Sequence, residues 1–134
     1  MHREIIIIVA ILAIIITFNS ITENYTNKCV KTMNNYFETL ATSAQTNISE
    51  GNDNNYNEIM STLDEMDNQW QKIRKNLAYY VEHDELEKVD TSIVVFKEDL
   101  KLKEYEEAIP EIKKCIFIME HIKDKGIFKV INLF

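Results

Sequence analysis

Apolar and polar residues divide the chain into two parts with different patterns. Near the start, Ile5 to Ile16 is an uninterrupted run of 12 apolar residues behind a short polar head. Extended to Ile21 the run has 17 residues. As a helix it spans about 25 Å, close to the roughly 30 Å hydrocarbon core of a bilayer. Because a helix satisfies its own backbone hydrogen bonds in lipid, the run predicts a membrane helix over residues 5–21.

A cleaved secretory signal is the alternative to an uncleaved anchor. Signal peptides end in small residues of the Ala-x-Ala type, whereas Thr17 to Thr22 offers only Ser20-Ile21-Thr22 as a weak cleavage site. We therefore expect the segment to stay attached. A polar head before an apolar run is typical of a signal-anchor, which leaves the head in the cytoplasm. This predicts a single-pass protein of the cell membrane, with an anchor at residues 1–21 and an extracytoplasmic domain at residues 22–134.

After residue 22 the apolar positions recur at steps of three and four, the spacing of one face of a helix. Turn-forming and polar residues separate four such stripes, at 49–55, around Asp84 and at 101–104. In chain order the apolar positions are Val30, Met33, Phe37, Leu40, Ala44 and Ile48; Ile59, Leu63, Met66, Trp70, Ile73, Leu77 and Tyr80; Leu86, Val89, Ile93, Phe96 and Leu100; Ala108, Ile112, Cys115, Met119 and Ile122.

The predicted fold class is all-α. The N-terminal membrane helix continues into the first stripe and is followed by an antiparallel up-and-down bundle of about four helices, in which the first and fourth are neighbours. The chain has only two Gly and one Pro, which favours long helices. The competing architecture is a long two-helix hairpin that forms a homodimer through the same stripes.

Local signals predict the helix ends. Asp84 with Glu87 three residues later forms a capping pattern that would start the third helix. Pro110 is expected in the first turn of the fourth helix or at a kink just beyond it, and Gly126 is expected to close that helix as a left-handed cap. A short apolar tail follows, which we expect either to pack under the base of the bundle or to dock to a partner. Its apolar residues are Ile127, Phe128, Val130, Ile131, Leu133 and Phe134.

The charge of the chain limits its partners. It has 15 basic and 22 acidic side chains, a net charge of −7. Such a surface repels the phosphates of nucleic acids and of anionic lipids. Basic residues form no cluster larger than a pair such as Lys113-Lys114. We therefore exclude nucleic acid as a partner and assign the membrane contact to residues 5–21.

No residue pattern indicates catalysis. The chain contains no Gly-rich phosphate loop, no Gly-x-Ser-x-Gly elbow and no His-Glu-x-x-His motif, so we expect no enzymatic activity and no cofactor. His83 with Glu85, and Glu120 with His121, are the only sets that resemble metal ligands. Ordinary capping and surface roles explain both sets, and we assign no metal site.

The two cysteines, Cys29 and Cys115, fall on the neighbouring first and fourth predicted helices at similar heights above the membrane. An extracytoplasmic compartment permits a disulfide between them. Cys115 also fits its apolar stripe as a buried thiol. The sequence leaves both outcomes open.

Several short landmarks resemble one bacterial family. They are Trp70; Tyr80-Val81-Glu82-His83 with Glu85 and Leu86; His121-Ile122; and the terminal Asn132-Leu133-Phe134. On these residues the chain resembles the family catalogued as domain of unknown function 4363, over most of the predicted extracytoplasmic domain. The resemblance implies a small helical protein with an N-terminal hydrophobic segment, and it implies no chemical activity.

These observations favour a non-enzymatic, membrane-anchored helical protein that binds another membrane or envelope protein. The second class is an extracytoplasmic ligand-binding or sensor-like domain, although only one membrane-crossing segment is predicted. The third is a metal-dependent enzyme that uses His83 and His121. A reproducible protein partner on purification would favour the first class, a bound small molecule the second, and a bound metal the third.

Overall fold

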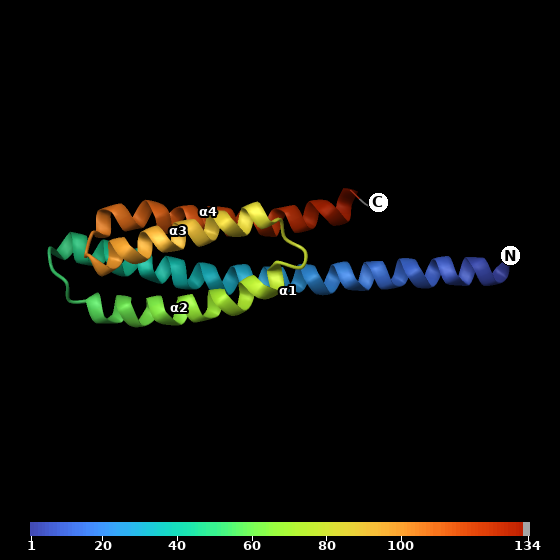
Figure 1. The fold of residues 1–134 in the computed structure, drawn as a ribbon, viewed down its shortest axis with the longest axis horizontal. Coiled ribbons are helices and arrows are strands. Elements are labelled where there is room, and N and C mark those ends of the chain that lie inside the picture. The colour runs from blue at the N-terminus through green and yellow to red at the C-terminus, as the bar shows by residue number, and fades with distance from the viewer. Residues whose placement is uncertain (133–134) are drawn as a thin grey trace.

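A computed structural model describes the backbone of residues 1–132 and the side chains of residues 1–125. Within these residues the chain forms four helices and no strand: α1 (His2–Glu50), α2 (Tyr56–Leu77), α3 (His83–Lys101) and α4 (Tyr105–Asn132). Figure 1 shows α1 as one long rod whose C-terminal part joins the other helices in a bundle and whose N-terminal part projects beyond it. The predicted all-α helical bundle is confirmed.

Helix α1 has no break between its apolar start and the bundle. It contains 49 residues, about 74 Å at 1.5 Å per residue. The predicted boundary at residue 21 lies inside this helix. The prediction that the N-terminal apolar segment continues into the first helix of the bundle is therefore confirmed.

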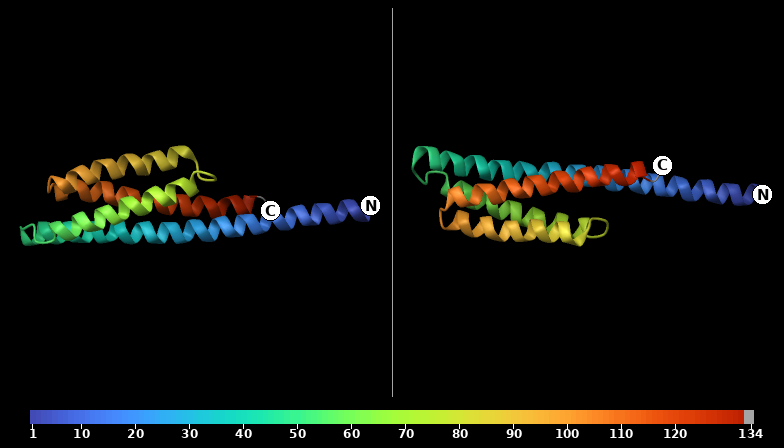
Figure 2. Two further views of the ribbon diagram at one scale, coloured as in Figure 1. Left: turned by 60° about the horizontal axis from the view of Figure 1, so that its bottom comes forward. Right: turned by 90° about the horizontal axis from the view of Figure 1, so that it is seen from above.

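The helices pack in an up-and-down order. α1 lies against both α2 and α4, and α3 lies against α4 and, less closely, α2. Figure 2 shows α4 running beside α1 over a long stretch in both views. The predicted contact between the first and fourth helices is confirmed.

The core consists of the predicted apolar stripes. All the predicted positions are buried except Ile48 and Tyr80, which are half-buried. At mid-bundle the rings of Phe37 and Phe96 meet edge to face, with centroids 6.1 Å apart and an interplanar angle of 84°. Each large apolar side chain buried in this way favours the folded state by about 1.5–3 kcal/mol.

The end of α1 explains why Ile48 is not fully buried. Gly51 adopts the left-handed conformation at φ 63°, its N–H donates to Ile48 O at 3.3 Å, and the N–H of Asn52 donates to Asn47 O at 3.2 Å. These two bonds form a Schellman motif. The Asn47 side chain takes the innermost position, where its Oδ1 accepts from the N–H of Asn55 at 3.3 Å.

A polar cluster joins the two turns at the far end of the bundle. Lys103 adopts a left-handed conformation at φ 62°, and its Nζ lies 3.1 Å from Asp53 Oδ2 and 4.9 Å from the centre of the Tyr56 ring. The Tyr105 hydroxyl donates to Asp53 Oδ1 at 2.9 Å. The hydrogen bond from Tyr105, then that from Lys103, holds the pKa of Asp53 below its ordinary value.

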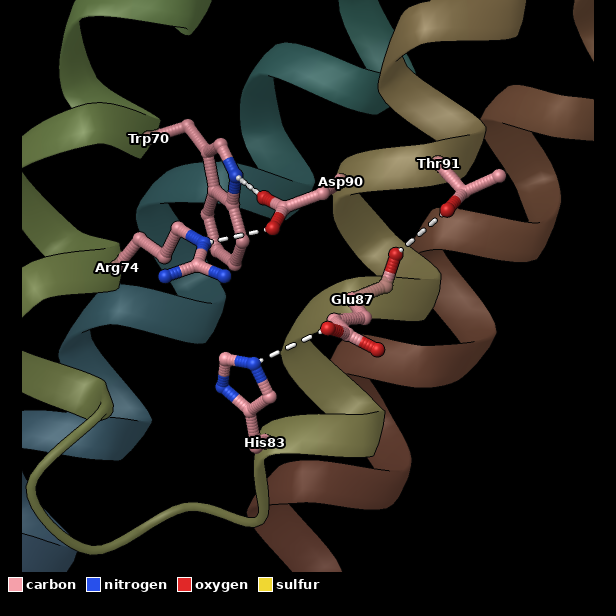
Figure 3. Close-up of polar contacts among 6 residues, drawn as sticks. All are labelled: Trp70, Arg74, His83, Glu87, Asp90 and Thr91. Carbon is pink, nitrogen blue, oxygen red and sulfur yellow. Dashed lines mark hydrogen bonds and ion pairs between the residues drawn. The ribbon is translucent and has the colours of Figure 1, made fainter.

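Polar bridges span the gap between α2 and α3. Trp70 Nε1 donates to Asp90 Oδ1 at 2.8 Å, and Arg74 Nε donates to Asp90 Oδ2 at 2.7 Å (Figure 3). Lys97 Nζ donates to Asp67 Oδ2 at 2.9 Å. These polar contacts join α2 to α3 in addition to the apolar core that both helices share.

The predicted start of α3 is wrong by two residues, since the cap was expected at Asp84 and lies at Glu82. The helix begins at His83 with Glu82 as its N-cap residue, and no side chain caps it. Asp84 consequently lies inside the first turn, where it cannot act as the cap. Glu87, the predicted partner of that cap, instead pairs through Oε1 with His83 Nε2 at 3.0 Å (Figure 3).

Helix α4 differs from its prediction at both ends. It begins at Tyr105, which puts Pro110 in the second turn, so the first of the two places predicted for this proline is wrong and the predicted kink beyond it stays a prediction. Gly126 does not end the helix, which continues to Asn132, because the residues that follow include no Pro and no further Gly. The predicted tail is thus helical as far as Asn132 and runs beside α1 (Figure 1). The tail side chains lie outside the described residues: Ile127, Phe128, Val130, Ile131, Leu133 and Phe134.

Candidate functional site

The N-terminal part of α1 is an apolar arm that the bundle does not cover. We define the arm as residues 1–18, all of which are exposed, and Ile5 to Ile16 carry exposed apolar side chains throughout. The most apolar 18-residue window of α1 has no buried residue, so the arm is not a core helix of the domain. It is long and apolar enough to cross a membrane.

A cleft opens where the arm enters the bundle. We call it the membrane-proximal cleft because it adjoins the segment that is long and apolar enough to cross a membrane, and it has a volume of about 210 Å³. Three segments that are distant in sequence form it, namely α1, the start of α3 with the turn before it, and α4. The lining residues are Phe18, Asn19, Thr22, Glu23, Thr26, Tyr80, Val81, Glu82, Glu85, Ile122 and Lys125.

Hydroxyl groups form one side of the cleft. The Thr26 Oγ1 lies 2.7 Å from Thr22 O and 3.0 Å from the Tyr80 hydroxyl, which joins α1 to the α2–α3 turn. Burial is the main cause that raises the pKa of Tyr80 above its ordinary value. Tyr80 therefore stays a neutral hydrogen-bonding group at physiological pH.

Charged groups form another side. Glu85, only 8 % exposed, has its Oε1 at 3.4 Å from His121 Nδ1 and 3.8 Å from Lys125 Nζ. Lys125 Nζ also lies 3.1 Å from Glu82 Oε2, and this contact is the main cause that raises the pKa of Lys125. Glu23, from α1, makes no ion pair among the described residues. The lining thus carries three carboxylates, Glu23, Glu82 and Glu85, against one ammonium group.

The cleft combines apolar surface with groups of both charges. Phe18, Val81 and Ile122 supply the apolar part of its lining. Pockets that pair apolar walls with a few convergent polar groups are typical ligand sites. In the part of the chain that the structure describes, no group of three or more His, Cys, Asp or Glu side chains is arranged to hold a metal ion. The arrangement is suited to binding an amphipathic molecule.

The structure separates the residues that the sequence had grouped as metal-ligand sets. His83 is exposed and pairs with Glu87, whereas Glu85 is buried and faces His121 of α4. Glu120 points toward α1, where its Oε1 accepts from Asn34 Nδ2 at 3.0 Å. Glu85 and His121, one from each set, come together, and of these two Glu85 lines the cleft.

The candidate disulfide is absent from the structure. Cys29 and Cys115 are both buried free thiols. Burial is the main cause that raises the pKa of each thiol, for Cys115 to about 12. Their neighbours differ, because Cys29 interacts with Tyr25 of its own helix and Cys115 with Ser92 of α3.

Sequence reasoning missed the contribution of α1 to the cleft. Thr26 continues the inward-facing stripe of Val30 toward the arm, and it is buried. A threonine in that stripe, four residues after Thr22, was a signal that a polar contact replaces apolar packing at the end of the bundle next to the arm. Nothing in the local sequence pattern indicated that Tyr80 and Lys125 would line the same cleft.

The family described as Domain of unknown function (DUF4363) matches residues 24–133. The match includes the whole bundle and leaves the apolar arm outside. Searches of curated proteins and of solved structures find no match for the chain. The short sequence landmarks had indicated the same family. Because the family match covers most of the sequence, the chain belongs to the DUF4363 family.

Proposed function

We propose that this protein is a non-enzymatic, single-pass membrane protein whose extracytoplasmic helical domain binds another membrane or envelope protein. The observation that supports the proposal is the continuity of α1, which runs from the exposed apolar arm to the far end of the bundle without interruption. A domain attached in this way has little freedom to turn relative to its anchor. Restricting that freedom before binding lowers the entropy cost of recognising a partner in the same membrane.

The domain also carries exposed apolar side chains that a partner can cover. Val94 on α3 is 63 % exposed and Phe117 on α4 is 74 % exposed. Tyr79 in the α2–α3 turn is 88 % exposed and directly precedes Tyr80 and Val81, which line the cleft. Isolated apolar residues are ordinary on protein surfaces, so these positions serve as sites to test and do not define an interface.

Reciprocal co-purification tests the proposal. The tagged full-length protein is isolated from gently solubilised membranes beside a variant whose residues 1–21 are replaced by an unrelated membrane span. We expect one reproducible partner, recovered in both directions and retained by the span-swapped variant. Recovery of no partner, or loss of the partner with the span swap, would contradict binding by the domain. Protease treatment of intact spheroplasts tests the topology, because the domain should be digested from outside.

Ligand binding is a second candidate function, and the membrane-proximal cleft is the observation that favours it. If the domain senses a small molecule, mass spectrometry of the gently purified protein should find that molecule bound in stoichiometric amount. Val81→Asp, which places a fourth carboxylate in the lining, should release it. A Val94→Asp variant is the matched control because Val94 lies outside the cleft lining.

A further inference from the structure

A carboxylate and the ammonium group of the membrane-proximal cleft come from different helices. Glu23 belongs to α1 and makes no ion pair among the described residues. Lys125 belongs to α4, and its Nζ is shared between Glu82 at 3.1 Å and Glu85 at 3.8 Å. Within the described residues the cleft therefore presents one carboxylate without a paired cation and one ammonium group with three N–H donors. This arrangement complements a molecule that carries both charges.

The apolar part of the lining fixes the level of the cleft relative to a bilayer. Phe18 and Asn19 belong both to the lining and to the predicted membrane span of residues 5–21. Four residues of helix, from Phe18 to Thr22, rise about 6 Å. If the arm spans the membrane, the cleft opens at the level of the lipid headgroups, with Phe18 and Ile122 facing the start of the acyl chains.

We propose that the membrane-proximal cleft binds the headgroup of a zwitterionic aminophospholipid, a lipid that carries a phosphate and a primary amine. The amine donates hydrogen bonds to the carboxylate of Glu23, and Lys125 donates to the phosphate. Asn19 and Thr22 supply further polar contacts. A volume of about 210 Å³ suits a headgroup and excludes the whole lipid. The net charge of −7 repels anionic lipids, which favours a zwitterionic headgroup over an acidic one.

Lipid retention by the full-length protein tests this inference, which rests on the membrane anchoring proposed above. The protein is incorporated into nanodiscs of equal parts phosphatidylethanolamine, phosphatidylcholine and phosphatidylglycerol, released into mild detergent, and analysed by native mass spectrometry. Incorporation reports anchoring, and the identity of the retained lipid reports the cleft. We expect phosphatidylethanolamine to be enriched over phosphatidylcholine by about tenfold, since a quaternary amine cannot donate hydrogen bonds to a carboxylate.

Two variants distinguish the two ends of the headgroup. Glu23→Gln should abolish the preference for the primary amine, whereas Lys125→Gln should reduce retention of both zwitterionic lipids because both contain the phosphate. Glu87→Gln is the control, since Glu87 lies outside the cleft and pairs with His83. Circular dichroism confirms that each variant is folded.

Three results would overturn the inference. The first is equal retention of the three lipids by the unaltered protein. The second is an unchanged preference in a folded Glu23→Gln variant. The third is displacement of the retained lipid by soluble phosphoethanolamine at equal concentration, which would identify a soluble ligand as the occupant instead of a membrane lipid.

Discussion

Replacing Asp90 with alanine tests how α2 and α3 are held together. The Trp70 side chain is buried, and its Nε1 has Asp90 as acceptor at 2.8 Å. Removing the acceptor leaves a buried N–H without a partner, which costs about 1–3 kcal/mol. The ion pair with Arg74 is also lost, but these two side chains are 27 % and 35 % exposed, so solvent screening limits that term to about 1 kcal/mol or less. We expect Asp90→Ala to lower the free energy of unfolding by about 2–3 kcal/mol.

Urea unfolding of the nanodisc-bound protein, followed by circular dichroism, measures this loss. With a denaturant slope of about 2 kcal/mol per molar, the midpoint should fall by about 1 M. Asp67→Ala is the matched control, because the contact of Asp67 among the described residues is an ion pair with Lys97 of similar exposure, and it should cost about 1 kcal/mol or less. Asp90→Asn keeps an oxygen acceptor for the indole and should restore most of the stability. Equal effects of Asp90→Ala and Asp67→Ala would refute the role assigned to the Trp70 N–H.

Three further predictions concern the thiols, the arm and the glycines. Because burial raises the pKa of Cys115 from 9.0 to about 12, alkylation of this thiol at pH 8 should be slow until urea unfolds the protein. The thiol ionises at lower pH in the unfolded chain than in the folded protein, so the urea midpoint of unfolding should fall as the pH rises above 9. This fall should be smaller in Cys115→Ala. Ile11→Arg should disfavour membrane insertion by roughly 3–4 kcal/mol, seen as release of the protein by alkaline carbonate, whereas Ser20→Arg at the end of the span should remain bound. Gly51→Ala should cost about 1–2 kcal/mol through its left-handed backbone, and Gly126→Ala inside α4 should stabilise by about 0.5–1 kcal/mol; calorimetry that found the same sign for both would contradict the two backbone assignments.

The stripes could be predicted from the sequence because burial on one face of a helix repeats every three or four residues. Met66, Trp70 and Ile73 show this directly, since each fell at the expected step and each is buried. The turn after α1 could also be predicted from the sequence, because Gly51 is the residue type that a left-handed helix end favours. These features depend on residues that are near one another in the chain.

The cleft could not be predicted because it depends on tertiary contacts. Thr26 and Tyr80 are 54 residues apart, and no local pattern indicates that their hydroxyls meet. Glu85 and His121 were each noticed, but each was grouped with its sequence neighbour instead of with the other. The expected cap at Asp84 was wrong because a capping pattern in the sequence does not by itself decide which residue starts the helix, and α3 starts two residues earlier with Glu82 as its N-cap residue.

The unbroken α1 has a mechanical consequence. Residues 22–50 of the helix rise about 44 Å at 1.5 Å per residue, so the α1–α2 turn stands that far above the membrane surface if the arm spans the bilayer. Any change in the inclination of the arm is amplified at that turn: a tilt of about 20° displaces it sideways by about 15 Å. A span near 25 Å is slightly shorter than a typical hydrocarbon core, which favours an upright arm and disfavours inclination. Bilayer thickness would thereby set the angle at which the whole domain stands, and a thinner bilayer would swing its outer end through an arc.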